Sequence, residues 1–312
     1  MKNIFPEFGF GAWQIGGKYE TEGSLSGWNV GSEQYTLGLV EKALECGVRF
    51  FDTAQAYGSE KNEQLIGRAL RNKKREQAII CTKISIGDDI KRSDYGSYLR
   101  KSINISLSNL GTDYIDILLL HNPSIKHINE HLSSELSSLK STGVIRDYGL
   151  SAKFLVDLIR ASEISFGNYC EWNYSLLERR IEPVLLEFFN NKAHKFIARS
   201  PLFRGIITDS FLQNGPDLVF DDVRSCFSGD CLSWVVHTSP LKIREYSNVF
   251  NLTASEFALA YLYSNENVIY IIPGIGKLMH LEVIKKIKGM SIKQLNSIKK
   301  LDLDIARNYS FN

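Results

Sequence analysis

The feature of this sequence that most limits its fold is a regular alternation of short apolar runs with longer segments of helical period. The runs are rich in β-branched residues and number about eight, the number of strands that a (β/α)8 barrel requires. Their nearly continuous apolar character suits parallel strands covered on both faces. The runs lie at 8–13, 47–51, 78–81, 115–120, 145–150, 169–172, 195–198 and 268–272.

Between the runs, apolar residues recur at helical spacing, and a glycine often follows the last of them. Ser32 is a candidate N-cap for the first of these segments, and Gly47 can end it. Gly111 and Gly143 take the same place after two later stripes. Strand, helix, glycine and strand again is the pattern of a parallel α/β sheet. Because no Pro-rich or Ser-rich linker interrupts it, the sequence predicts one domain over 1–312, a TIM barrel.

One section departs from this rhythm, at residues 206–250 between the seventh and eighth predicted strands. Long loops that follow barrel strands usually build the active-site face, so a functional loop is one interpretation. A surface excursion with a short helix of its own is the other, and the sequence leaves both open.

Charge and hydropathy exclude several classes of partner. The chain has 312 residues, of which 44% are hydrophobic and 23% charged, with a formal net charge of +2. This balance predicts neither a nucleic-acid nor a membrane partner, and no stretch approaches the ~18 apolar residues of a transmembrane helix. The basic segment 71–75 and the C-terminal lysines fit solvated helix faces, since no aromatic residues interleave them.

The five cysteines are odd in number, and nothing near the close pair Cys226 and Cys231 supplies metal-ligand partners. We therefore expect free thiols in a reducing cytoplasm, and no metal. The N-terminus lacks the apolar region of a signal peptide, which also favours a cytoplasmic protein. The sequence does not distinguish a monomer from a homo-oligomer.

Polar residues follow the apolar runs where the runs end. Asp52, His121 and Ser151 each come directly after one, Lys83 follows Cys81 and Thr82 at the end of another, and Tyr57 lies in the loop beyond Asp52. Because strand ends of a barrel converge on one pocket, we expect these side chains to meet. Taken singly, each could be a helix cap, an ion-pair partner or a core residue; at consecutive strand ends they favour a shared site.

The chemistry of this set favours proton transfer to an oxygen. A lysine ammonium beside Tyr57 favours the phenolate and lowers the phenol pKa, and a carboxylate beside the lysine keeps it charged. A histidine in the same pocket can hydrogen-bond a substrate carbonyl. Together these groups make an acid that protonates an oxygen as negative charge develops on it.

The first of these βα units resembles the signature of the aldo-keto reductase family, with FFDTAQAYGSEKNEQLIGRAL at 50–70. The lysine strand at 79–83 and the histidine strand at 113–121 match the family as well. The resemblance covers residues 8 to 290, and its further motifs are GLS at 149–151, NYSLLER at 173–179, SPL at 200–202, DDVR at 221–224 and IPG at 272–274.

The resemblance implies a (β/α)8 oxidoreductase that reduces an aldehyde or ketone, such as a sugar or another polar metabolite, to an alcohol by hydride transfer from NADPH. Tyr57 would be the general acid, Lys83 and Asp52 would lower its pKa, and His121 would orient the carbonyl. Lys277 is the candidate for the 2′-phosphate, and NADH is the alternative cofactor.

The resemblance and the strand ends together give candidate contacts. Cofactor binding is expected of Gly11, Ala12, Trp13, Asp52, Ser151, Glu171, Arg199, Ser200, Pro201, Leu202, Arg204, Gly274, Gly276, Lys277 and His280. The small-molecule carbonyl substrate is expected to contact Trp13, Tyr57, His121, Arg224 and Trp234.

The sequence departs from the family pattern at the cofactor positions. Ala152 stands where the family usually has Asn, Glu171 where it has Gln, and Arg199 where many members have Tyr. Near the adenine end, His280 and Ile284 replace the frequent Arg and Asn. These departures leave a nicotinamide-binding sensor or regulatory subunit with little turnover as an alternative function. A third hypothesis is a barrel lyase with Lys83 as a Schiff base, which a charged lysine would disfavour.

Overall fold

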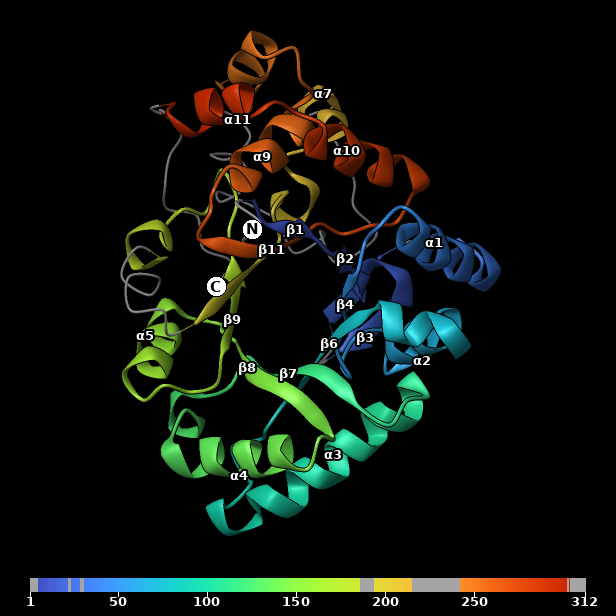
Figure 1. Cartoon of the computed structure of the whole chain (residues 1–312), viewed down its shortest axis with the longest axis vertical. Helices are drawn as coiled ribbons and strands as arrows, with labels where there is room; N and C mark the ends of the chain where they lie inside the picture. The colour runs from blue at the N-terminus through green and yellow to red at the C-terminus, as the bar shows by residue number, and fades with distance from the viewer. Residues whose placement is uncertain are drawn as a thin grey trace.

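The computed structural model describes residues 5–21, 24–28, 31–185, 194–214, 242–301 and 303. They form a parallel barrel surrounded by helices (Figure 1). The barrel strands are β1 (Glu7–Phe8), β2 (Phe10–Gly11), β5 (Phe50–Asp52), β6 (Ile79–Ile84), β7 (Ile115–His121), β8 (Ile145–Ser151), β9 (Tyr169–Asn173), β10 (Lys195–Arg199) and β11 (Val268–Ile272). The predicted (β/α)8 barrel is thus confirmed.

The barrel closes through its first strand, which is divided in two at Gly9. The sheet order is β1-β11-β10-β9-β8-β7-β6-β5-β2, with parallel pairing throughout. β1 pairs with β11 and β2 with β5, so consecutive parts of one strand bridge the two ends of the sheet. The prediction that this strand runs to Trp13 is wrong, because Ala12–Gly16 forms a 3-10 helix, η1.

Helices cover the outside of the barrel. They are α1 (Glu33–Glu45), α2 (Lys61–Ala69), α3 (Tyr95–Leu110), α4 (Glu130–Ser141), α5 (Leu155–Glu163), α7 (Asp209–Asn214), α9 (Ala254–Tyr263), α10 (Leu278–Lys288) and α11 (Ile292–Lys299). Short 3-10 helices lie at Asn72–Gln77, Arg92–Asp94, Ile125–His127 and Phe203–Gly205. None of the helices in the described ranges is both long and apolar enough to span a membrane.

The helix ends agree with the sequence. The Ser32 side chain accepts a hydrogen bond from the Tyr35 backbone N–H at 3.2 Å, as an N-cap does. Gly47, Gly111 and Gly143 have φ of 85°, 61° and 81°, the left-handed conformation that ends helices.

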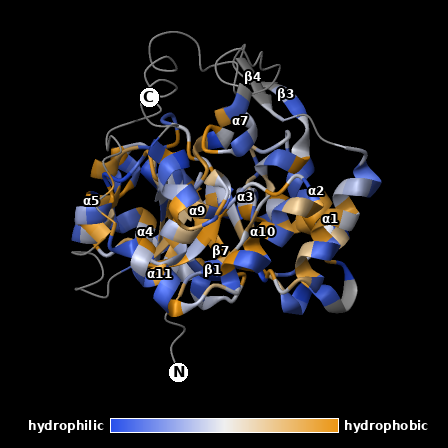
Figure 2. Ribbon diagram, turned by 90° about the horizontal axis from the view of Figure 1, so that it is seen from above, coloured by the Kyte–Doolittle hydropathy of each residue, from blue (hydrophilic) through white to orange (hydrophobic). Residues whose placement is uncertain are grey.

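Two apolar layers form the core, one inside the barrel and one between barrel and helices. Figure 2 shows hydrophobic segments both in the middle of the molecule, around β7, and along surrounding helices such as α1. The inner layer consists of Phe50, Cys81, Ile117, Leu119, Tyr169, Ile197 and Ile272. Gly149 allows β8 and β9 to approach closely, since a Cβ there would overlap the carbonyl oxygen of Tyr169.

The section between β10 and β11 contains short helices joined by turns where the structure describes it. It contains α7 and a helix at 242–249. Residues 215–241 lie outside the described residues, and with them Arg224, Trp234, Cys226 and Cys231. The cysteines at 46, 81 and 170 are free thiols, as expected.

Candidate active site

The alternation of side chains along the strands carries a set of polar groups to one mouth of the barrel. Residues two apart on a strand face the same side, so the residue two beyond an inner-layer residue also faces the barrel interior. This relation links Phe50 to Asp52, Cys81 to Lys83, Leu119 to His121, Tyr169 to Glu171 and Ile197 to Arg199. All five polar side chains therefore lie at the carboxyl ends of parallel strands, where barrel active sites are built.

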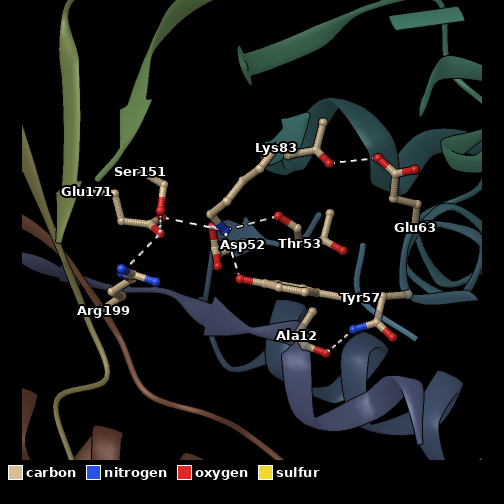
Figure 3. A network of polar contacts seen from close by, with 11 residues as sticks. Ala12, Asp52, Thr53, Tyr57, Glu63, Lys83, Ser151, Glu171 and Arg199 are labelled. Carbon is tan, nitrogen blue, oxygen red and sulfur yellow. Dashed lines mark hydrogen bonds and ion pairs between the residues drawn. The ribbon is translucent and has the colours of Figure 1, made fainter. Parts of the chain in front are cut away.

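Lys83 is the centre of the polar network (Figure 3). Its Nζ donates to Asp52 Oδ1 at 2.5 Å, to the Thr53 carbonyl oxygen at 3.1 Å and to the Tyr57 hydroxyl at 3.5 Å. The Lys83 side chain is fully buried, so these contacts replace the water that an ammonium would otherwise bind. The predicted meeting of Asp52, Tyr57 and Lys83 is present in the structure.

A second buried carboxyl group, that of Glu171, lies beside this pair. Its Oε2 is 3.6 Å from Lys83 Nζ, and its Oε1 accepts a hydrogen bond from Ser151 Oγ at 2.8 Å. Arg199 Nε lies 3.9 Å from Oε1, while Arg199 Nη2 donates to the Ala152 carbonyl at 2.8 Å. Glu171, Ser151 and Arg199 thus form one network with the lysine.

Opposing effects set the charges of Lys83 and Asp52. Burial and the neighbouring Glu171 raise the pKa of Asp52 to about 8, although Lys83 opposes them. Burial alone would lower the pKa of Lys83, but Asp52 and Glu171 raise it well above its ordinary value. Lys83 is therefore charged at neutral pH.

Tyr57 has a higher pKa than the sequence predicts. Lys83 lowers the pKa of the phenol, as expected, but burial outweighs it and raises the pKa to about 12. The hydroxyl consequently keeps its proton at neutral pH and remains next to an ammonium that would stabilise the phenolate.

His121 lies next to Tyr57 at the end of β7. The rings are edge to face, with their centroids 5.6 Å apart. Burial, Lys83 and Arg199 lower the pKa of His121 to about 3, so the imidazole is neutral. Tyr57 and His121 are partly exposed whereas Lys83 and Asp52 are buried, so the first two are the groups that a ligand can reach.

An aromatic wall adjoins Tyr57. Trp13 stacks on Tyr57 at 5.9 Å between ring centroids, and Trp28 meets Trp13 edge to face at 6.0 Å. The Arg204 guanidinium lies over the Trp13 ring at 5.6 Å. Trp13 therefore lies beside Tyr57, in η1 rather than at the end of a strand, and its contact with a substrate stays a prediction.

The other predicted cofactor residues lie in two segments. Arg199 to Arg204 continues β10 into a turn in which Ser200, Phe203 and Arg204 have positive φ. Gly274 is bridged to Gly11 of β2. Lys277 is the exposed N-cap residue of α10, and His280 Nδ1 accepts a hydrogen bond from the Gly276 backbone N–H at 3.3 Å.

Burial lowers the pKa of His280, with Lys277 acting in the same direction, so His280 does not replace the charge of an arginine. Ile284 belongs to the apolar core.

Three residues that the sequence does not predict as functional, Thr53, Asn62 and Trp28, also contact this site or its wall. Thr53 accepts a hydrogen bond from Lys83 at its backbone carbonyl, a group that every residue has, so the sequence gives no signal for this contact. Asn62 is buried and its side-chain amide donates to the Ala12 carbonyl at 2.5 Å, fixing η1 against α2. Its place inside an apolar helix face was the signal that could have identified it.

In the described part of the chain, Asp52, Cys81 and Glu171 place possible metal-ligand atoms within 4.8 Å of one another. Lys83 Nζ already contacts Asp52 and lies 3.6 Å from Glu171, so an ammonium supplies the positive charge there. We therefore interpret the cluster as a charge network and assign it no metal.

Comparison with known proteins agrees with this arrangement. The family model described as "Aldo/keto reductase family" matches residues 7–303. The chain is 27% identical over 298 residues to an uncharacterized oxidoreductase, YqkF, of Bacillus subtilis (strain 168), covering 91% of this chain and 94% of the relative. It is 29% identical over 224 residues to the NADH-specific methylglyoxal reductase of Escherichia coli (strain K12), covering 66% of each.

The solved structure of an aldo-keto reductase from Klebsiella pneumoniae in complex with NADPH shares the fold. The TM-score is 0.68 at 20% identity, and the match covers 96% of this chain and 95% of the other. With the family model matching nearly the whole sequence, the chain belongs to the aldo/keto reductase family and is an NAD(P)H-dependent oxidoreductase.

Proposed function

We propose that this protein reduces an aldehyde or ketone to an alcohol, with Tyr57 as the general acid. The observation that carries the proposal is the position of the Tyr57 hydroxyl, 3.5 Å from a buried Lys83 ammonium that also contacts Asp52. A partly exposed, protonated phenol beside a fixed positive charge suits proton donation to an oxygen that becomes negative in the transition state.

Each residue of the set has a distinct role in this proposal. Neutral His121 donates a hydrogen bond to the carbonyl oxygen and holds it near Tyr57. Tyr57 then transfers its proton to that oxygen, and Lys83 stabilises the phenolate that remains. Asp52 and the Thr53 carbonyl hold Lys83 in place through their contacts with Nζ.

NADPH is the proposed cofactor, and when bound it supplies the hydride for the carbonyl carbon. The groups that would hold it fit a phosphorylated, amide-bearing molecule. Arg199 Nε is buried with no hydrogen-bond partner in the described part of the chain, so it can donate to an incoming oxygen. Arg204 and Lys277 supply positive charge, and the first turn of α10 offers backbone N–H groups for phosphate. The NADH-specific relative makes NADH the alternative.

The test compares Tyr57→Phe with the wild type. We expect the variant to bind NADPH unchanged, measured by protein fluorescence, and to lose about 10²–10⁴-fold in turnover on a panel of aldehydes, ketones and sugars. Tyr98→Phe is the matched control, since it removes a hydroxyl that donates to the Ser85 carbonyl and makes none of the contacts with Lys83. Unchanged turnover in Tyr57→Phe would refute the mechanism.

The same assays separate the other two hypotheses. NADPH binding without turnover of any carbonyl by the wild type would favour the sensor. A lyase requires Lys83 as a free amine, which the raised pKa of Lys83 opposes. Trapping of a substrate on Lys83 by borohydride would nevertheless establish it.

A further inference from the structure

Glu171 brings a second carboxyl group to a site that needs only one to hold its lysine. Its side chain is fully buried, and one of its carboxyl oxygens lies within 4.8 Å of a carboxyl oxygen of Asp52. Two carboxylates this close among buried groups repel each other, and a pair so placed commonly retains one proton.

The hydrogen bonding of Glu171 points to the same conclusion. Oε1 is satisfied by Ser151 Oγ at 2.8 Å, but Oε2 has no hydrogen-bond partner in the described part of the chain. Lys83 Nζ, at 3.6 Å, lies beyond hydrogen-bond distance. A buried oxygen without a donor is costly when ionised, and a proton on the pair removes that cost.

We propose that Glu171 is a positioning residue that shares one proton with Asp52 beside the Lys83 ammonium, so that the two carboxyl groups carry a single negative charge between them. The raised pKa of Asp52, about 8, agrees with a pair that keeps this proton at neutral pH. The charged and titratable groups that face the pair are Tyr57 from the loop after β5, Cys81 and Lys83 from β6, His121 from β7 and Arg199 from β10.

Arg199 does not remove the need for the proton. Its Nε lies 3.9 Å from Glu171 Oε1, its side chain is 22% exposed, and its Nη2 is used by the Ala152 carbonyl. This cation is thus partly exposed and shared with the Ala152 carbonyl, so it offsets the second carboxyl charge only in part.

The consequence for catalysis rests on the proposed reductase function. With the proton present, Lys83 is balanced by one negative charge and its field reaches the Tyr57 hydroxyl. Loss of the proton adds a second negative charge, which raises the pKa of Tyr57 and weakens it as an acid. Turnover should therefore fall as pH rises through the titration of the pair.

The first test uses infrared spectroscopy on the cofactor-free wild type in D2O. We expect the C=O stretch of a protonated carboxylic acid at neutral pH, and its loss as pH rises through about 8. The band should be absent from both Glu171→Gln and Asp52→Asn, because either change leaves one carboxylate paired with Lys83. Glu63→Gln is the matched control: Glu63 is equally buried but accepts from Thr82 and Asn109, so the band should persist.

Absence of the band from the wild type, or its persistence in Glu171→Gln, would overturn the proposal. The wild-type titration needs no variant, so a misfolded substitution does not weaken the test. The second readout is the pH profile of turnover, which should lose its fall near pH 8 in Glu171→Gln. If the band titrates but the protein has no reductase activity, the shared proton is supported and the proposed function is refuted. If the protein is an active reductase without the band, the proposed function stands and the shared proton is refuted.

Discussion

Replacing Lys83 with Met tests whether charge, rather than packing, holds the interior of the active site together. Methionine keeps an unbranched chain of similar length and removes the ammonium that contacts Asp52 and Tyr57. Lys83 is fully buried and Asp52 nearly so, with 0% and 7% of their side chains exposed, so solvent screens little of the loss. Breaking a buried ion pair on one side costs about 3–5 kcal/mol, a large part of a typical free energy of unfolding of about 5–15 kcal/mol.

The loss of folding stability in Lys83→Met should depend on pH, and the number of protons bound by the folded and unfolded states decides in which direction. Without Lys83, the pKa of Asp52 in the folded protein rises further above its unfolded value, because the lysine is the group that lowers it. The folded state then binds more protons than the unfolded state at neutral pH, so stability falls as pH rises, by up to about 1.4 kcal/mol per pH unit for each extra proton. The stability gained by protonating the carboxyl group is fully present below its pKa in the unfolded state, about 4, and is lost as pH rises to its pKa in the folded state.

Urea denaturation at about pH 5.5 and about pH 8 measures this difference. We expect Lys83→Met to be destabilised at both values and more strongly at the higher one. The double variant Lys83→Met/Asp52→Asn should recover part of the loss at high pH, since one acid is gone. Lys42→Met, at an exposed ion pair with Glu45, is the control and should show no added pH dependence. If Lys83→Met lowers the free energy of unfolding by the same amount at both pH values, lost packing rather than lost charge explains the destabilisation.

Three further outcomes follow from the geometry. Ser32→Ala removes the N-cap hydrogen bond of α1 and should lower the free energy of unfolding by about 1 kcal/mol, measured in urea. Gly149→Ala places a methyl group against the Tyr169 carbonyl between β8 and β9, and should yield no cooperative thermal transition by circular dichroism. The imidazole resonances of His121, with a pKa of about 3, should not titrate in NMR between about pH 5 and 8, where an ordinary histidine does.

The sequence was sufficient to predict the barrel because its strands are buried on both faces and therefore apolar throughout. It did not reveal the hairpin of β3 (Lys18–Thr21) and β4 (Ser24–Gly27), whose sequences KYET and SLSG give no clear alternation of apolar and polar residues. It also gave no sign that the first strand divides at Gly9, since that depends on partners far away in the chain.

The members of the site were predictable for a related reason. Asp52, Lys83 and His121 lie at strand ends, which sequence periodicity locates, and their meeting follows from the parallel barrel. Their ionisation was not predictable. The pKa of Tyr57 depends on how far burial outweighs Lys83, and that of Asp52 on the distance to Glu171, which comes from a strand across the barrel.

The raised pKa of Tyr57 is compatible with its role as an acid, because the acceptor in the proposed reaction is a strong base. A phenol with a pKa of about 12 stays protonated at neutral pH and is ready to donate. The oxygen that gains charge during carbonyl reduction becomes an alkoxide, which binds protons about as strongly as hydroxide does, so the pKa of its conjugate acid lies well above that of Tyr57. Transfer from Tyr57 is then downhill, and Lys83 acts mainly by stabilising the phenolate left behind. Loss of Lys83 should accordingly lower kcat much more than it raises KM.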